Sequence, residues 1–196
     1  EDYLYGVLYH EVGSWWPMES LKAQAIAART YALYQKRYTT NRTFDVFNNQ
    51  FSQMYGGADS ERNRSNDAVD ATRGQVLTYG GRIFPAYYHS ACGGQTRDSS
   101  ELWKIKLPPL SGGVTCEYCW FSPHYSWHAK VKLSDMEDLL RKHGVSVGTI
   151  VDMDVVTRSP SGRVLTALER GSAGEKVLDA KSLRLWVGPT VVRSEN

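Results

Sequence analysis

Glu11 is a carboxylate at a position where the pattern of a helix calls for an apolar residue. Leu4 and Val7 precede it with the spacing of one helix face. Burial on such a face disfavours the charged form of a carboxyl group, so the group stays protonated closer to neutral pH, as a general acid must. Trp15 and Trp16 follow, and we expect them to add apolar surroundings. The alternative is a glutamate near a helix end that turns to solvent.

Arg29 is a second charged residue on an apolar helix face, the one marked by Ala25, Ile26 and Leu33. A guanidinium group in such a place needs a planar anionic partner. One interpretation is a structural ion pair, and the other is a clamp on a substrate carboxylate. A position too close to Glu11 would lower the pKa of that carboxyl, so we expect near neighbours and not a tight pair.

Three cysteines and a histidine form another candidate site. His89-x-x-Cys92 and Cys116-x-x-Cys119 supply four nitrogen and sulfur ligands with the spacing of a structural zinc site. A zinc ion would also hold a long irregular segment in place. Because three thiolates make a closed ligand set, we expect the metal to be structural and not to do the chemistry.

Other assignments of the same residues stay open. His124 or His128 could replace the histidine of the first motif as the fourth ligand. The rival to zinc is a disulfide between Cys116 and either Cys119 or Cys92, which leaves one thiol over. A catalytic cysteine is the weakest option, because no partnered base is visible.

The elements that must position these residues are helices first and mostly strands afterwards, which is typical of an α+β fold. Periodicity and stop signals predict helices over 2–12, 18–37, 60–72, 134–143 and 180–185. Runs rich in β-forming residues predict a hairpin of 75–79 and 82–88 around two glycines, and strands at 44–47, 129–133, 150–157, 163–168 and 175–178.

The expected architecture is a set of N-terminal helices packed against mostly antiparallel strands, with the long irregular region of residues 89–128 clamped by zinc. Ser134 and Glu137 have the spacing of a capping box at a helix start. We expect a catalytic core over residues 1–128, and a smaller β-rich part over residues 129–196 that packs on the core of the same domain.

The composition limits which kinds of molecule the protein is expected to bind. The formal net charge of +2 gives no case for nucleic acid, which needs a clustered basic face. Six Trp and twelve Tyr are many for 196 residues, and they suit either carbohydrate or ordinary packing. No apolar run is long enough to span a membrane. The first residues already read as a helix, so we expect the chain to begin inside a longer precursor.

Long motifs run through the first two thirds of the chain. They are Tyr3-Leu4-x-Gly6-Val7-Leu8-x-x-Glu11, Trp16-Pro17-x-Glu19-x-Leu21-Lys22-Ala23-Gln24-Ala25-x-Ala27-Ala28-Arg29-Thr30-Tyr31-Ala32, Ser52-Gln53-x-Tyr55-Gly56, Ala68-Val69-x-x-Thr72-x-Gly74-x-Val76-Leu77-x-Tyr79-x-Gly81 and Ala86-x-Tyr88-His89-Ser90-x-x-Gly93-Gly94-x-Thr96. With these motifs the sequence resembles the SpoIID/LytB family. It departs from the common family pattern at Cys92, where the family often has Ser, and at Ser52, where it often has Cys.

The resemblance implies a lytic transglycosylase that cleaves MurNAc–GlcNAc bonds in peptidoglycan, with Glu11 as the catalytic acid and base. Such enzymes close a 1,6-anhydro ring within the sugar, so one carboxyl suffices, whereas a hydrolase normally needs two. Asp45 and Asp59 are expected to be turn residues and not a second catalytic acid.

The resemblance also implies a substrate and a groove. The family's sporulation enzyme prefers glycan strands stripped of peptides, and Arg29 is the expected partner of the exposed lactyl carboxylate. Residues expected to line the groove are Gln53, Tyr55, Tyr88, His89 and Ser90. The place of action would be outside the cytoplasm, in sporulation or in other wall remodelling.

Two other functions remain open. Some family members are named as modifiers of cell-wall amidases, so the chain could be a glycan-binding partner that stimulates an amidase, with Glu11 as a binding residue. Zinc-dependent hydrolysis would need an open metal site, which three thiolates do not favour.

Overall fold

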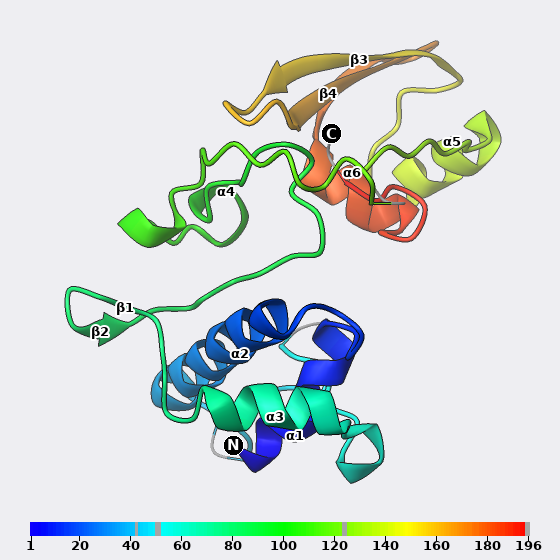
Figure 1. The fold of residues 1–196 in the computed structure, drawn as a ribbon. Helices are drawn as coiled ribbons and strands as arrows, with labels where there is room; N and C mark the ends of the chain where they lie inside the picture. Colours follow the sequence, from blue (N-terminus) through cyan, green and yellow to red (C-terminus); the bar gives the residue numbers. More distant parts are fainter. Residues whose placement is uncertain (42, 50–51, 123–124, 195–196) are drawn as a thin grey trace. The chain divides into compact units, whose positions relative to one another are not determined.

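The computed structural model describes residues 1–41, 43–49, 52–122 and 125–194 as two compact units. The first unit comprises residues 1–89 and the second residues 90–196. Both combine helices with antiparallel strands, so the predicted α+β class is confirmed (Figure 1). Residues 90–128, which the sequence assigns to the catalytic core, group by their contacts with the C-terminal strands. The expected packing of residues 129–196 on the core stays a prediction.

Three helices build the first unit (Figure 1). They are α1 (Asp2–Glu11), α2 (Met18–Tyr38) and α3 (Asn63–Ala71), close to the predicted bounds. Leu4 and Leu8 of α1 pack against Leu21, Ala25 and other small residues of α2 and α3. Alanines on the inner face of α2 let the other helices approach closely.

A short hairpin follows α3 in the first unit. Strands β1 (Thr78–Tyr79) and β2 (Arg82–Ile83) pair antiparallel and are shorter than predicted. Gly80 and Gly81 join them with φ values of 56° and 74°, the left-handed conformation that a two-residue hairpin turn requires. The predicted strand at residues 44–47 does not form. Among the described residues between α2 and α3, the regular structure is limited to the 3-10 helix η1 (Ala58–Ser60).

The second unit is built on a three-stranded antiparallel sheet in the order β3-β4-β5. Its strands are β3 (Ile150–Arg158), β4 (Val164–Gly171) and β5 (Gly174–Asp179). Helices α5 (Leu133–Lys142) and α6 (Ala180–Val187) enclose a small apolar core with the sheet (Figure 1). The region before α5 is mostly irregular. Its described residues contain α4 (Ser100–Trp103), η2 (Pro108–Leu110) and an isolated bridge of Gln95 with Thr115.

Two local expectations in the second unit are wrong. Residues 129–133 form no strand. The capping box is absent because Lys132 occupies the N-cap position without a side-chain bond. The Glu137 carboxylate instead accepts a hydrogen bond from the backbone N–H of Ile150 at 2.9 Å, so it ties α5 to the start of β3. Among the described residues, no helix combines the length and apolarity needed to cross a membrane.

Arg29 anchors the first unit from inside. Its side chain is 5% exposed and pairs with Glu1, with 2.7 Å between Nη2 and Oε2. Further bonds reach the carbonyl oxygens of Val69 and Gln75 and the hydroxyl of Thr72, so its five N–H groups are all directed at this chain. The structure therefore has the ion pair that the sequence offers as one of two interpretations. A bond to a substrate carboxylate stays a prediction and would require breaking part of this set.

We expect Arg29→Gln to destabilise the protein by about 3–5 kcal/mol, because the carboxylate of Glu1 and two carbonyl groups would lose their buried donor. The measurement is urea unfolding. The matched control is Arg73→Gln, which removes an exposed arginine paired with Asp70 and should change the unfolding midpoint little. Equal effects of the two substitutions would contradict the anchoring role.

Candidate functional site

Glu11 is the last residue of α1, and it is half-buried. Its Oε1 accepts a hydrogen bond from the backbone N–H of Met54 at 3.1 Å, and its carboxylate also takes one from the hydroxyl of Tyr88. Burial raises the pKa of the carboxyl, and the two hydrogen bonds and the charge of His10 only partly oppose this. The group therefore holds its proton to higher pH than an ordinary glutamate does.

Gln53 lies at the centre of the hydrogen bonds that reach Glu11. Its side chain is 1% exposed. Its Oε1 accepts a bond from the hydroxyl of Tyr3 at 3.1 Å, and its Nε2 donates to the Tyr88 hydroxyl at 3.0 Å and to the carbonyl of Ala28 at 3.2 Å. Burial raises the pKa of Tyr88 well above its usual range, so this phenol keeps the proton that it donates to Glu11.

The backbone of residues 52–57 docks on α1 because two glycines allow it. The N–H of Gly56 donates to the carbonyl of Gly6 at 3.0 Å. A Cβ atom at Gly6 would lie 2.5 Å from the ring of Tyr55, and one at Gly56 would collide with His10. The Tyr55 ring stacks on Tyr3, with centroids 5.4 Å apart. This close docking brings the N–H of the intervening segment to the carboxylate at the end of α1.

The tryptophans after Glu11 do not provide the expected apolar wall. Trp15 is 76% exposed and Trp16 47% exposed. The contacts of the carboxylate come instead from the docked segment and from Tyr88. In the described part of the chain, the groups that shift the pKa of Glu11 include no second carboxylate. Asp59 lies in η1, and Asp45 lines a different cleft, beside Arg29.

Cys92, Cys116 and Cys119 meet in the second unit. Their sulfur atoms all lie within 4.8 Å of one another, with 3.6 Å from Cys119 to Cys92 and 3.8 Å from Cys119 to Cys116. All three are free thiols, and Cys92 is buried. Burial raises the pKa of Cys92 to about 11, whereas the backbone N–H of Tyr118 leads the effects that lower the pKa of Cys116. The three sulfurs are close enough to bind one metal ion.

The three sulfur atoms do not identify the fourth ligand that a tetrahedral zinc ion would need. His89 is the last residue of the first unit, and its part in the cluster stays a prediction. His124 falls outside the described residues, and His128 is exposed. Ser90 belongs to the second unit, so its place in the groove with Gln53 and Tyr88 also stays a prediction.

The chain is similar to a known protein family and to several known proteins. A family model described as "Stage II sporulation protein" (SpoIID) matches residues 1–79. The stage II sporulation protein D of Bacillus subtilis is 26% identical over 206 aligned residues, which cover 96% of this chain and 57% of that protein. Residues 1–79 thus match the SpoIID family, and the chain is similar to a SpoIID protein over almost its whole length.

Two further relatives match different lengths of the chain. An uncharacterised protein of Brachyspira hyodysenteriae is 32% identical over 197 residues, which cover all of this chain and 52% of that protein. An amidase enhancer of Bacillus subtilis is 43% identical over 107 residues, which cover 55% of this chain and 14% of that protein. The chain thus spans about half the length of the relatives that match it throughout.

The SpoIID match includes Glu11, Gln53 and Tyr3, but ends before the cysteine cluster. Tyr3 has a place in the site that the sequence reasoning missed, although Tyr3, Val7 and Glu11 share one helix face at four-residue spacing. The backbone N–H of Met54 was also missed. No side-chain pattern could have revealed it, because the backbone carries no residue-type signal.

Glu11→Gln should change the pH dependence of stability in this protein. The folded state holds the Glu11 proton more tightly than the unfolded chain, so folding stability falls as the pH rises from 4.5 through the raised pKa. Glutamine does not titrate and escapes this loss. The melting temperature of the variant, relative to the original protein, should therefore rise with pH across this window and then level off.

Thermal unfolding between pH 4 and pH 8 measures this, with Glu19→Gln on the exposed surface of α2 as the matched control. A difference between Glu11→Gln and the original protein that stays constant or falls with rising pH would show that the carboxyl is not held in its neutral form.

Proposed function

We propose that this chain is a lytic transglycosylase that cleaves MurNAc–GlcNAc bonds in peptidoglycan, with Glu11 as acid and then base. The observation that carries the proposal is the raised pKa of a single carboxyl, held by the N–H of Met54 and the hydroxyl of Tyr88. One carboxyl fits internal ring closure, since a glycoside hydrolase normally uses two. The match of residues 1–79, which contain Glu11, to the SpoIID family model supports the same substrate.

The proposed reaction needs no group besides the sugar and Glu11. Protonated Glu11 gives its proton to the oxygen that links C1 of MurNAc to GlcNAc, and the C1–O bond breaks as positive charge develops at C1. The resulting carboxylate then takes the proton from the C6 hydroxyl of the same MurNAc, whose oxygen bonds to C1. The products are a 1,6-anhydro end and a GlcNAc hydroxyl, and Glu11 is again protonated.

Tyr88 and Gln53 position the carboxyl in this scheme. The Tyr88 hydroxyl supports the charged form after proton transfer, while burial favours the neutral form before it. Gln53 holds Tyr88 in turn. Tyr55 stacks beside this network and offers an aromatic face to a sugar ring. Since the substrate lies outside the cytoplasm, we also place the protein there, acting on strands freed of their peptides.

Glu11→Gln should lower the rate of cleavage at least about 100-fold, because the amide cannot transfer the proton. Purified glycan strands, with and without stem peptides, are incubated with the protein, and anhydro-ended products are counted by mass spectrometry. Glu19→Gln serves as the matched control and should keep the original rate. Products with free reducing ends would show a hydrolase, and an original protein that releases no anhydro ends would overturn the proposal.

The second candidate function is non-catalytic binding to glycan that stimulates a cell-wall amidase. The 43% identity to an amidase enhancer favours it. In this case Glu11 binds the sugar without proton transfer. The two functions separate in one assay, since a modifier would accelerate amidase release of stem peptides while forming no anhydro ends.

We further propose that the cysteine cluster holds a structural zinc ion. Three sulfurs within 4.8 Å of one another, one of them with a lowered pKa, suit zinc better than a harder metal. His89 is the proposed fourth ligand. The ion would cross-link two irregular segments, at Cys92 and at 116–119, and would take no part in the chemistry.

Elemental analysis should find one zinc per chain, with all three thiols protected from a thiol reagent until a chelator is added. Cys119→Ser should lose the metal and lower the melting temperature, because the sulfur of Cys119 lies within 3.8 Å of both other sulfurs. Alkylation after chelation counts the thiols. Zinc near zero together with a single free thiol would identify the disulfide instead.

A further inference from the structure

Glu169 is a buried carboxyl group in the middle of the second unit, on the central strand β4. It is 0% exposed, and neither of its carboxylate oxygens has a hydrogen-bond partner among the described residues. An isolated buried charge is so costly that a carboxyl group in such a place takes up a proton instead. The fold therefore holds Glu169 in its neutral form, and the proposed cleavage reaction makes no use of it.

The register of the sheet places Glu169 on the face that packs against α6. Ala167, two residues before it in β4, lies on the same face and pairs with Leu178 of β5. Leu178 belongs to the apolar core, against which Leu183 and Trp186 of α6 pack. β4 itself also contacts α6 (Figure 1). The carboxyl group thus belongs to the layer between the sheet and this helix.

The strands beside β4 place one charged side chain opposite Glu169. Lys176 of β5 is its pairing partner, and paired residues share a face with their Cβ atoms about 5 Å apart. Lys176 is exposed, and no hydrogen bond or ion pair engages its side chain in the described part of the chain. The partner of Glu169 on β3 is the uncharged Met153. Lys176 is therefore available to an ionised Glu169.

The charged groups of α6 make bonds to other parts of the chain. Lys181 donates to the carbonyl of Leu102 at 2.9 Å and Arg184 to that of Arg193 at 3.0 Å, while the Nε of Arg184 is buried without a partner. Burial is the only cause that raises the pKa of Glu169, so no charge on β3, β5 or α6 offsets it. The two bonds join α6 to the irregular region and to the C-terminal segment, so a movement of α6 would release both.

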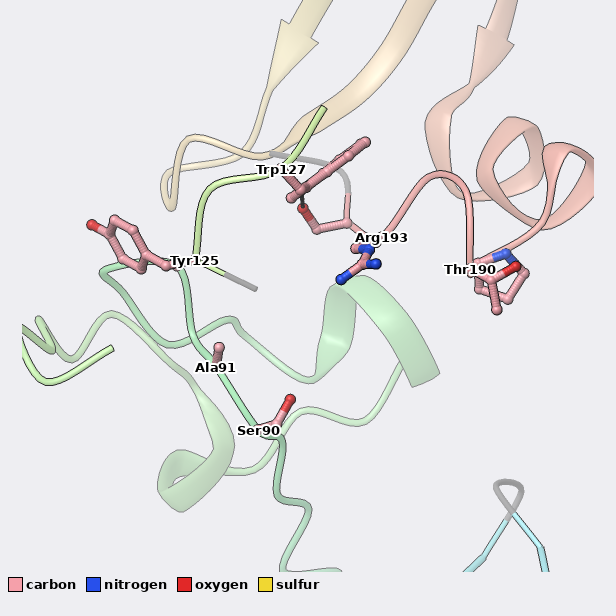
Figure 2. A pocket seen from close by; sticks show the side chains of 9 residues that line it. Ser90, Ala91, Tyr125, Trp127, Thr190 and Arg193 are labelled. Carbon is pink, nitrogen blue, oxygen red and sulfur yellow. Dashed lines mark hydrogen bonds between the residues drawn. The ribbon is translucent and has the colours of Figure 1, made fainter. Parts of the chain in front are cut away.

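Glu169 is not placed to bind a ligand. A cavity of about 400 Å³ lies in the same unit, beside Ala91, Tyr125 and Trp127 (Figure 2). Glu169 is not among the residues that line it. Because the carboxyl group is fully covered, the chemistry open to it in this fold is the gain and loss of a proton.

We propose that Glu169 and Lys176 form a pH-dependent switch that controls the packing of α6. At low pH Glu169 is neutral and buried, as the structure shows it. As the pH rises, the carboxyl group loses its proton to solvent and turns from the core toward the ammonium group of Lys176, and α6 packs less tightly on the sheet. The switch does not depend on the proposed cleavage reaction.

Hydrogen exchange of the backbone amides of α6 tests the switch in the full chain. Between pH 4.5, the ordinary pKa of a glutamate, and the raised pKa of Glu169, the closed form holds the proton and the open form has lost it. The opening equilibrium, corrected for intrinsic exchange, should therefore rise by up to about tenfold per pH unit in this window. Glu169→Gln does not titrate and should show a constant opening equilibrium.

Glu175→Gln is the matched control, because Glu175 is an exposed glutamate of β5 that pairs with Arg170, and it should behave as the original protein. Comparison with Glu169→Gln also cancels any contribution from His143, which stacks on Trp186 of α6.

Lys176→Gln tests the partner of the ionised form. It should lower the opening equilibrium at the upper end of the window about threefold, the worth of an exposed ion pair, and should change nothing when Glu169 is already replaced by Gln. The same pH dependence in Glu169→Gln and in the original protein would overturn the switch. An unchanged opening equilibrium in Lys176→Gln would overturn the pairing.

Discussion

The buried side-chain amide of Gln53 is the interaction on which the Glu11 site depends. It accepts from Tyr3 of α1 and donates to the carbonyl of Ala28 in α2 and to Tyr88, so it joins three segments far apart in sequence. A buried amide is costly unless its partners are all present. Because every polar atom of this amide must be hydrogen-bonded, Gln53 fixes the positions of its three partners. One of these partners, Tyr88, donates to Glu11.

Glu11 is consequently held between opposing effects. Burial favours the neutral acid, and the donors from Met54 and Tyr88 favour the carboxylate. Neither effect alone would suit a group that must give a proton and then take one back, because full burial would prevent ionisation and strong hydrogen bonding would prevent protonation. Arg29 is engaged with Glu1 at the other end of α1 and is not among the groups that shift the pKa of Glu11.

The sequence predicts the regular elements well, because each depends on local periodicity. The helices and the three strands of the second unit follow from spacing and stop signals, as does the glycine turn at Gly80. The capping box fails because Lys132 is the N-cap residue, and Glu137 bonds instead to Ile150, thirteen residues away. The setting of Glu11 also depends on distant contacts, with a backbone N–H at Met54 and a phenol at Tyr88. Its apolar neighbours in sequence, Trp15 and Trp16, stay exposed.

The irregular part of the second unit has few β-sheet hydrogen bonds, and other contacts hold it in place. Between residues 90 and 128 only one isolated β-bridge is present in the described chain. Buried Arg163 satisfies carbonyl groups there, and three sulfurs gather two loops at one point. Both devices act on Cys92, through its carbonyl and through its thiol. Since Ala91 and Gly93 on either side of it line a cavity of the second unit, the residues that order this segment also shape the wall of that cavity.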